Sequence, residues 1–252
     1  MRVRCLSKIA TPDQAERYGG TYKVIREYDL TPGKEYVVVA LTAGVGDSAY
    51  GRGVHIEALD DSGRWSSNPL FLFDLVDPRP SRYWIAKKVG AAELALAPES
   101  FFRDSYHDGL TDGVPEIVAD FKRVSALLMA EFASPQEFVG ILIERYGALW
   151  RLFDSLKQEH GDKVPPQIFL EDLVYWLIAR LTKGGSRDGL LLEILSFLED
   201  VFTHGDAQVK QLLALSFLQR LLDSGQSGSE LRSLIGPAMS EELQKRQCSP
   251  AR

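Results

Sequence analysis

One stretch of the sequence, FFRDSYHDGLTDG, gathers the side chains best suited to chemistry. Within ten positions it holds Arg103, Asp104, Tyr106, His107, Asp108 and Asp112. A histidine flanked by acids can act as a general base, and together with carboxylates it can ligate a divalent cation. Acidic loops also produce such clusters without any catalytic role. A metal-dependent hydrolase centred on His107 is therefore kept as an alternative function.

The same stretch lies in the most acidic part of the chain. Between Glu93 and Asp120 seven residues are acidic and one is basic, so this segment alone carries a net charge of -6, equal to that of the whole chain. It is either a solvated surface or a contact surface for a cationic partner, because complementary charge accelerates and selects association. Its aromatic residues either anchor an interface or plug the space between a sheet and its helices. The residues expected at a contact surface are Phe102, Asp104, Tyr106, Asp108, Asp112 and Glu116.

Other sequence patterns that suggest chemistry are incomplete. Gly44-x-Gly46-x-x-Ala49 follows a strand-like run, as in dinucleotide-binding proteins, but a second strand follows where the phosphate-binding helix belongs. The loop from Gly44 to Gly53 is instead a second candidate for partner contact. The four histidines are scattered, and no zinc, calcium or nucleophile-elbow spacing occurs. We therefore expect no catalytic residue, no metal and no cofactor, and hence no enzyme.

Composition restricts the class of protein. The chain has 252 residues, of which 45% are hydrophobic and 25% charged, which is typical of one or two globular domains. A net charge of -6 disfavours nucleic acid as a partner, because lysine and arginine supply most of the affinity for phosphates. Only two cysteines occur, and no signal peptide or long apolar run is visible. These features predict a cytoplasmic protein without a membrane span, and they leave its oligomeric state open.

The first half of the sequence predicts an antiparallel sheet. Strands are expected over 21–30, 34–43 and 53–77, the last region being broken by a tight turn at Asp60-Asp61-Ser62-Gly63. Over about residues 22–77 the chain resembles a small SH3-like barrel, and the resemblance lies in the segments LTPGKEYVVVAL, VHIEALDDSG and PLFLFDLVD. The linker 78–113 contains two further segments that can pair as strands, RYWIAKK and ELALA. The stretch around Cys5 is expected to be a loose segment without regular structure. Residues 1–113 are thus the expected N-terminal domain.

The second half, residues 114–252, predicts an all-α domain. From about Val114 apolar residues recur with helical spacing. Ser134-Pro135 with Glu137 forms a capping box that starts one helix, and Asp188 or Ser186 can start another. Gly205 ends that helix and Asp206 caps the next, so FLEDVFTHGDAQVKQLLALSFLQRLL forms a pair of antiparallel helices. The fold class expected is α+β, an SH3-like sheet or barrel followed by helical hairpins of the HEAT-like kind.

The hairpin sequence FLEDVFTHGDAQVKQLLALSFLQRL also resembles the C-terminal helical domain of immunity proteins from bacterial polymorphic toxin systems. The resemblance implies that the protein binds and neutralises a cognate protein toxin, with no catalytic residue of its own. Many such toxins are nucleases, whose basic clefts suit an acidic cover. An alternative to the immunity function is that of a scaffold or adaptor protein, which binds a peptide or protein partner through its helices.

Overall fold

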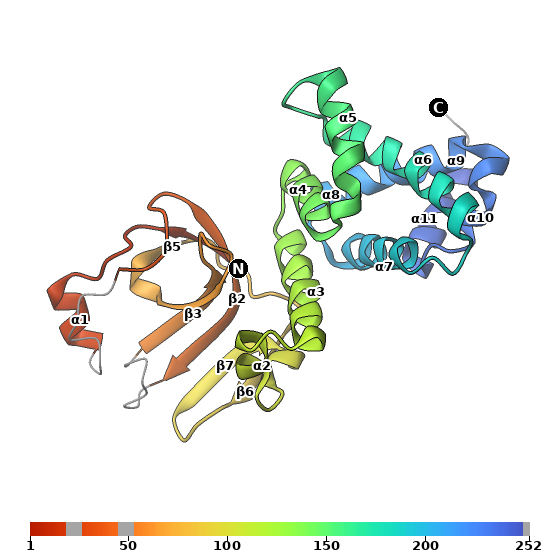
Figure 1. The fold of residues 1–252 in the computed structure, drawn as a ribbon. Coiled ribbons are helices and arrows are strands. Elements are labelled where there is room, and N and C mark those ends of the chain that lie inside the picture. The colour runs from red at the N-terminus through yellow and green to blue at the C-terminus, as the bar shows by residue number, and fades with distance from the viewer. Residues whose placement is uncertain (19–26, 45–52, 249–252) are drawn as a thin grey trace. The chain divides into compact units, whose positions relative to one another are not determined.

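A computed structural model describes residues 1–18, 27–44 and 53–248, and it shows an α+β protein (Figure 1). Two compact units are present, Met1–Leu128 and Met129–Arg252. The first contains an antiparallel sheet of seven strands, and the second is helical. The predicted α+β class is therefore confirmed. The domain boundary predicted after residue 113 remains a prediction, and the compact units divide further along the chain, within helix α3 (Pro115–Glu131).

The sheet of the first unit is built around its longest strand, β2. The strands are β1 (Arg2–Cys5), β2 (Glu35–Gly44), β3 (Gly53–Leu59), β4 (Trp65–Pro69), β5 (Phe73–Asp77), β6 (Trp84–Lys88) and β7 (Glu93–Pro98). β3 pairs along one edge of β2, while β1 and β7 pair with the beginning and the end of its other edge. β4 extends the sheet from β3, β5 from β1, and β6 from β7, and every pairing is antiparallel. The strands predicted for 34–43 and 53–77 and the two linker strands are confirmed.

Alternation along the strands decides which side chains form the core of the sheet. Val38 on β2 and Ile56 and Ala58 on β3 are completely buried and pack together with Val3 of β1. This pattern is expected where one face of an antiparallel sheet is covered, because successive side chains point to opposite faces. It also places His55 and Glu57 of β3 on the opposite face of the sheet.

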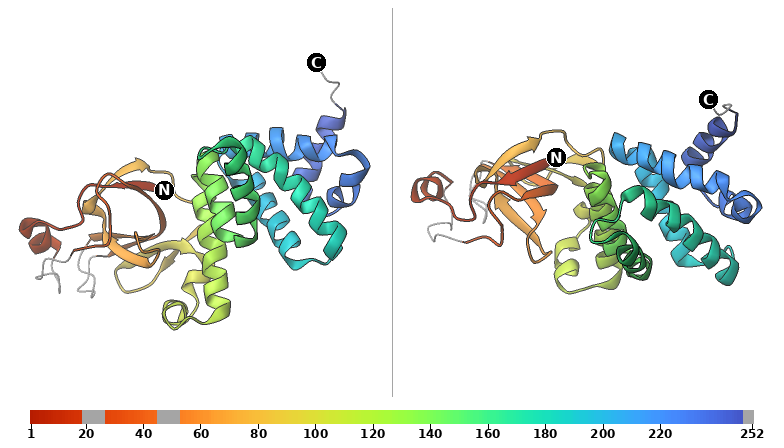
Figure 2. Two further views of the ribbon diagram at one scale, coloured as in Figure 1. Left: turned by 45° about the horizontal axis from the view of Figure 1, so that its top comes forward. Right: turned by 90° about the horizontal axis from the view of Figure 1, so that it is seen from above.

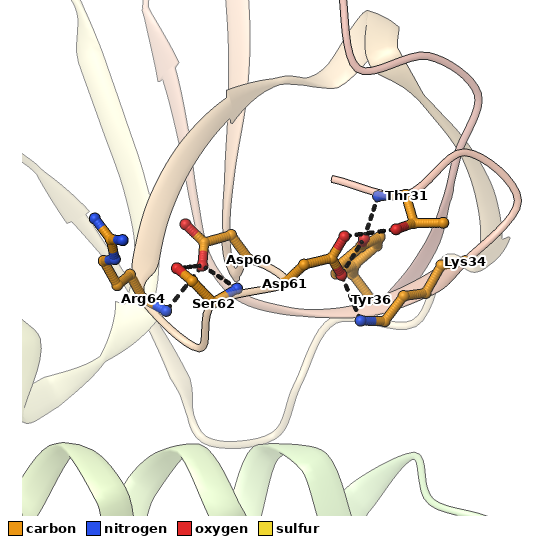
Figure 3. Close-up of polar contacts among 7 residues, drawn as sticks. All are labelled: Thr31, Lys34, Tyr36, Asp60, Asp61, Ser62 and Arg64. Atoms are coloured by element: carbon orange, nitrogen blue, oxygen red, sulfur yellow. Dashed lines mark hydrogen bonds and ion pairs between the residues drawn. The ribbon is translucent and has the colours of Figure 1, made fainter. Parts of the chain in front are cut away.

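The turn between β3 and β4 is the one that the sequence predicts. Gly63 has a φ of +77°, a conformation that favours glycine. The carboxylate of Asp60 accepts hydrogen bonds from the backbone N–H groups of Ser62 and Arg64, at 3.0 and 2.9 Å (Figure 3). These bonds hold the turn from inside, as an aspartate at the start of a turn commonly does.

The next residue, Asp61, ties this turn to the segment before β2. Its carboxylate accepts hydrogen bonds from the Thr31 hydroxyl at 2.7 Å, the Lys34 ammonium at 2.5 Å and the Tyr36 hydroxyl at 2.9 Å (Figure 3). Lys34, followed by the other donors, lowers the pKa of Asp61 to about 2. Burial, together with Asp61, raises the pKa of Tyr36 to about 12. The network fixes the start of β2 and has no feature of a reactive site.

The N-terminal segment differs from its prediction. The stretch around Cys5 is a strand and not a loose segment, because Val3 and Cys5 alternate into the core and are buried. A helix that the sequence did not predict, α1 (Pro12–Tyr18), follows. Most of the strand predicted over 21–30 lies outside the described residues. In its described part, Glu27 forms an isolated bridge with Ile9.

The helices after the sheet begin and end close to the predicted signals. They are α2 (Tyr106–Thr111), α3 (Pro115–Glu131), α4 (Pro135–Arg145), α5 (Trp150–His160), α6 (Pro166–Gly184), α7 (Gly189–His204), α8 (Ala207–Leu212), α9 (Gln219–Asp223), α10 (Ser229–Arg232) and α11 (Pro237–Cys248). Ser134 and Glu137 form the predicted capping box of α4, and Asp188 caps α7. Gly205 ends α7 and Asp206 caps α8. The predicted helix after Ser134 is interrupted at Tyr146 by a 3₁₀ turn, Gly147–Leu149.

A π-helical segment, Leu213–Leu218, joins α8 to α9 without a break in the chain direction. It buries Leu213, Phe217 and Leu218 alongside α6, and Figures 1 and 2 show the two runs of helix side by side. The wider π turn is not visible in the sequence, because apolar residues spaced for an α-helix suit both geometries. Among the described residues, no helix has the length and apolar character needed to cross a membrane.

A carboxylate on α7 caps the last helix, α11. Glu199 accepts hydrogen bonds from the backbone N–H groups of Ala238 and Met239, at 2.5 and 3.1 Å, and so caps the first turn of α11. We expect Glu199→Ala to lower the free energy of unfolding by about 1–2 kcal/mol, because the capping acceptor is lost. Urea denaturation measures this change. Glu193→Ala on the exposed face of the same helix is the control, and an equal loss in both variants would contradict the capping role.

Candidate contact surface

An aromatic cluster holds the segment between β7 and α3 against the sheet. It consists of Trp65 on β4, Phe101 in the 3₁₀ helix Glu99–Phe102, Tyr106 at the start of α2 and Phe121 on α3. The ring of Trp65 stacks on that of Phe121 with 5.4 Å between centroids, and the Phe101 ring lies 4.9 Å from Trp65. Phe101 also stacks on Tyr106 at 5.1 Å. Phe101 and Tyr106 of the acidic stretch thus form part of a plug between the sheet and the helices, one of the two interpretations of the sequence.

A polar network around Asp120 completes the attachment. Its carboxylate accepts hydrogen bonds from the Tyr106 hydroxyl at 2.9 Å, from Arg103 at 2.8 Å and from Arg123 at 3.1 Å. Burial raises the pKa of Asp120, but these hydrogen bonds and the charge of Arg103 outweigh burial, so the pKa lies below its usual value. Burial and the neighbouring carboxylate raise the pKa of Tyr106. The negative charge of Asp120 is therefore compensated locally and does not add to an outward field.

The four acids that were predicted for partner contact project into solvent. Asp104, Asp108, Asp112 and Glu116 are all exposed, and none forms an ion pair with another described residue. They are carried by α2, by the turns on either side of it and by the first turn of α3, and the aromatic cluster fixes this segment to the sheet. Asp108 and Glu116 also lie in the first turns of α2 and α3, where a negative charge favours the helix. These four residues are called the acidic surface below.

The two aromatic residues predicted for partner contact have different positions. Phe102 is half-buried, and the Nζ atom of Lys87 lies 5.3 Å from the centre of its ring. Tyr106 is only 2% exposed. Its side chain belongs to the aromatic cluster, so the expectation that it contacts a partner directly is corrected: Tyr106 supports the acidic surface from beneath.

The residues of the alternative catalytic site do not converge. His107 is exposed, and its ring meets the Trp65 ring edge-on at 5.2 Å. In the part of the chain that the structure describes, no group of three or more His, Cys, Asp or Glu residues is placed to hold a metal ion. The second candidate contact region, the loop from Gly44 to Gly53, lies outside the described residues except for its two ends, which pair with each other.

A polar group that no sequence motif marks lies on the sheet face opposite the core. Burial raises the pKa of Glu57 above the usual value for a glutamate, more than the neighbouring side chains of Trp65 and Thr42 lower it. His55, two residues earlier on the same face, is buried. The alternation in VHIEAL is the signal that would have found them, because Ile56 and Ala58 face the core.

The raised pKa of Glu57 predicts how stability depends on pH. The folded state retains the proton more strongly than the unfolded state, so the stabilising contribution is present at low pH and is lost as pH rises through the folded pKa. We expect Glu57→Gln to increase stability relative to the natural chain at pH 8 and to give little gain at pH 4. Urea denaturation at both pH values measures this difference. Glu99→Gln at an exposed position is the control, and a gain independent of pH would contradict the prediction.

Comparison with known proteins identifies a family model that covers part of the chain. No curated protein and no solved structure matches the chain. A family model described as a domain of unknown function, DUF7674, matches residues 142–249, which run from the second half of α4 through α11.

Proposed function

We propose that the protein is an immunity protein, which binds a cognate bacterial toxin and blocks it by covering the toxin's active site or substrate path. The observation that carries this proposal is the acidic surface: four exposed carboxylates without ion pairs to described residues, presented by a segment that the aromatic cluster holds in place. The resemblance of the α7–α8 hairpin to immunity proteins supports the same proposal.

The charge of the acidic surface indicates the chemistry of the partner. Carboxylates that have no local counter-ion attract a cationic surface, and this attraction increases the rate of association. Nuclease toxins fit this requirement because their clefts must be basic to hold a phosphate backbone. Asp120 marks the limit of the surface, since Arg103 and Arg123 already compensate its charge. The contact is therefore expected to involve Asp104, Asp108, Asp112 and Glu116, with Phe102 beside them.

The finer features of the fold are part of the proposal. We assign the curved sheet of the first unit to the SH3-like barrels and the α7–α8 pair to the HEAT-like hairpins. In this account the helices hold a shape and contribute no chemistry. A toxin that acts on cellular nucleic acid must be blocked where that nucleic acid is, so we place the protein in the cytoplasm.

A second candidate function, that of a helical adaptor, rests on a different surface. Among the described residues of the helical unit, three large hydrophobic side chains are at least half exposed: Trp150 on α5 at 57%, Tyr175 on α6 at 50% and Leu215 in the π-helical segment at 55%. Exposed aromatic residues commonly anchor a protein or peptide partner. Loss of a partner on Trp150→Ala, with retention when the acidic surface is neutralised, would favour the adaptor.

Co-purification tests the immunity function. The protein is expressed with an affinity tag together with an inactive form of the product of the neighbouring gene. We expect a stable complex that survives size-exclusion chromatography at low salt. If the neighbouring product neither co-purifies nor is toxic when expressed alone, the proposal of an immunity protein is wrong.

A further inference from the structure

From Ile85 onward, strand β6 is exposed on both of its faces. Ile85, Ala86, Lys87 and Lys88 are all exposed, and Val89 after them is 48% exposed. Among the described strands β6 pairs only with β7, and it forms a border of the sheet (Figure 1). A strand in a sheet normally buries at least one face, so β6 takes part in the core of its unit only through its first residue, Trp84, whose indole packs against the core and donates to the Val39 carbonyl at 3.0 Å.

The hydrogen bonds of the β6–β7 hairpin show which backbone groups of β6 point outward. The Val89 N–H donates to the Glu93 carbonyl at 3.1 Å, at the end of the regular antiparallel register between the two strands. In such a ladder, residues alternate between bonding to the neighbour and pointing away from it. The N–H groups of Lys87 and Ile85 therefore face β7, and those of Ala86 and Lys88 face outward. The Trp84 N–H donates to the Ser81 carbonyl at 3.2 Å.

The other two border strands are less suited to receive an added strand. β4 ends in Pro69, which has no N–H to donate, and the ladder of β5 with β1 is irregular between Arg2 and Val3. Lysines on a border strand usually discourage pairing. In β6, however, the Lys87 ammonium lies over the Phe102 ring at 5.3 Å, to one side of the strand.

We propose that the free edge of β6 binds an extended segment of another protein, which adds to the sheet as an antiparallel strand. The segment places apolar side chains opposite Ile85 and Val89 and acidic side chains opposite Lys87 and Lys88, because these lysines are the charged residues of the strand. This site takes a partner of the opposite charge to the one expected at the acidic surface. The occupant is a segment of another protein and not a second copy, since pairing β6 with the β6 of a second copy would bring the lysines of the two strands together.

A designed peptide provides the probe. Acetyl-Thr-Val-Glu-Glu-Thr-Val-Thr-amide, aligned antiparallel, sets its two valines opposite Val89 and Ile85 and its two glutamates opposite Lys88 and Lys87. We expect it to shift the backbone amide resonances of Ala86 and Lys88 in the full chain and to slow their hydrogen exchange. A matched peptide with both glutamates replaced by lysine is expected to bind more weakly.

Two variants separate edge pairing from other binding. Ala86→Pro removes an outward N–H without removing a bond to β7, and it is expected to weaken peptide binding about tenfold, whereas Ala86→Val is expected to leave it unchanged. Lys87→Glu with Lys88→Glu is expected to reverse the preference between the two peptides. The proposal is overturned if the peptide leaves the Ala86 and Lys88 amide resonances unchanged, or if neither Ala86→Pro nor the double lysine variant changes peptide binding. It is also overturned if the edge instead pairs two copies of the chain.

Discussion

Replacing Asp104, Asp108 and Asp112 together with asparagine is expected to weaken binding to the cognate toxin by about 100-fold. Each exposed charge pair at an interface contributes about fivefold, so three together give this magnitude. Asparagine keeps the shape of the side chain, and the aromatic cluster that holds the segment is untouched. Titration calorimetry of the complex measures the change. The loss is expected to arise mainly from slower association, and to shrink as salt is raised.

A matched variant tests whether position or total charge is responsible. Glu144, Glu193 and Glu230 are exposed acids of the helical unit, and replacing all three with glutamine changes the net charge by the same amount. We expect this variant to bind nearly as tightly as the natural chain. Equal weakening in the two triple variants would mean that only net charge matters, and unchanged affinity in the asparagine variant would remove the acidic surface from the account.

Trp65→Ala is expected to cause the largest loss of stability, about 3–5 kcal/mol in the free energy of unfolding. Its indole contacts the rings of Phe101 and Phe121, so the substitution leaves a cavity between them. Chemical denaturation followed by circular dichroism measures the loss. We also expect weaker toxin binding, because the acidic surface loses its attachment to the sheet.

Trp150→Ala is the control for this substitution. Trp150 is 57% exposed, and its ring meets one other ring, that of Phe153. Its replacement is expected to change the free energy of unfolding far less than that of Trp65. Similar losses in the two variants would show that the aromatic cluster is not what holds the segment on the sheet.

Local signals in the sequence predicted most of the elements, and the reason is visible in their contacts. Ser134 and Glu137 form a capping box from residues three apart, and Gly63 supplies a positive φ within a turn of a few residues. β1 escaped prediction because four residues carry too little pattern, although Val3 and Cys5 do alternate into the core. The π-helical segment and the break at Tyr146 escaped because apolar spacing alone does not fix the exact helical geometry.

The sequence also predicts the candidate contact surface only in part. The exposure of Asp104, Asp108, Asp112 and Glu116 agrees with their charge, and composition alone was enough to select them. Tyr106 was assigned to the surface because an aromatic residue among acids suits an interface and a plug equally well. Its place is decided by Trp65, which lies far from it in sequence and reaches it only through the pairing of β3 with β4. No local pattern contains that information.

Titration of toxin activity with the protein tests the central claim most directly, namely that the protein acts by stoichiometric binding and makes or breaks no bonds. The active product of the neighbouring gene is assayed while increasing amounts of the protein are added. We predict a linear fall in activity that reaches zero at one molecule of protein per molecule of toxin. Complete protection by a small fraction of an equivalent would contradict the account, since only a catalyst can act on many toxin molecules in turn.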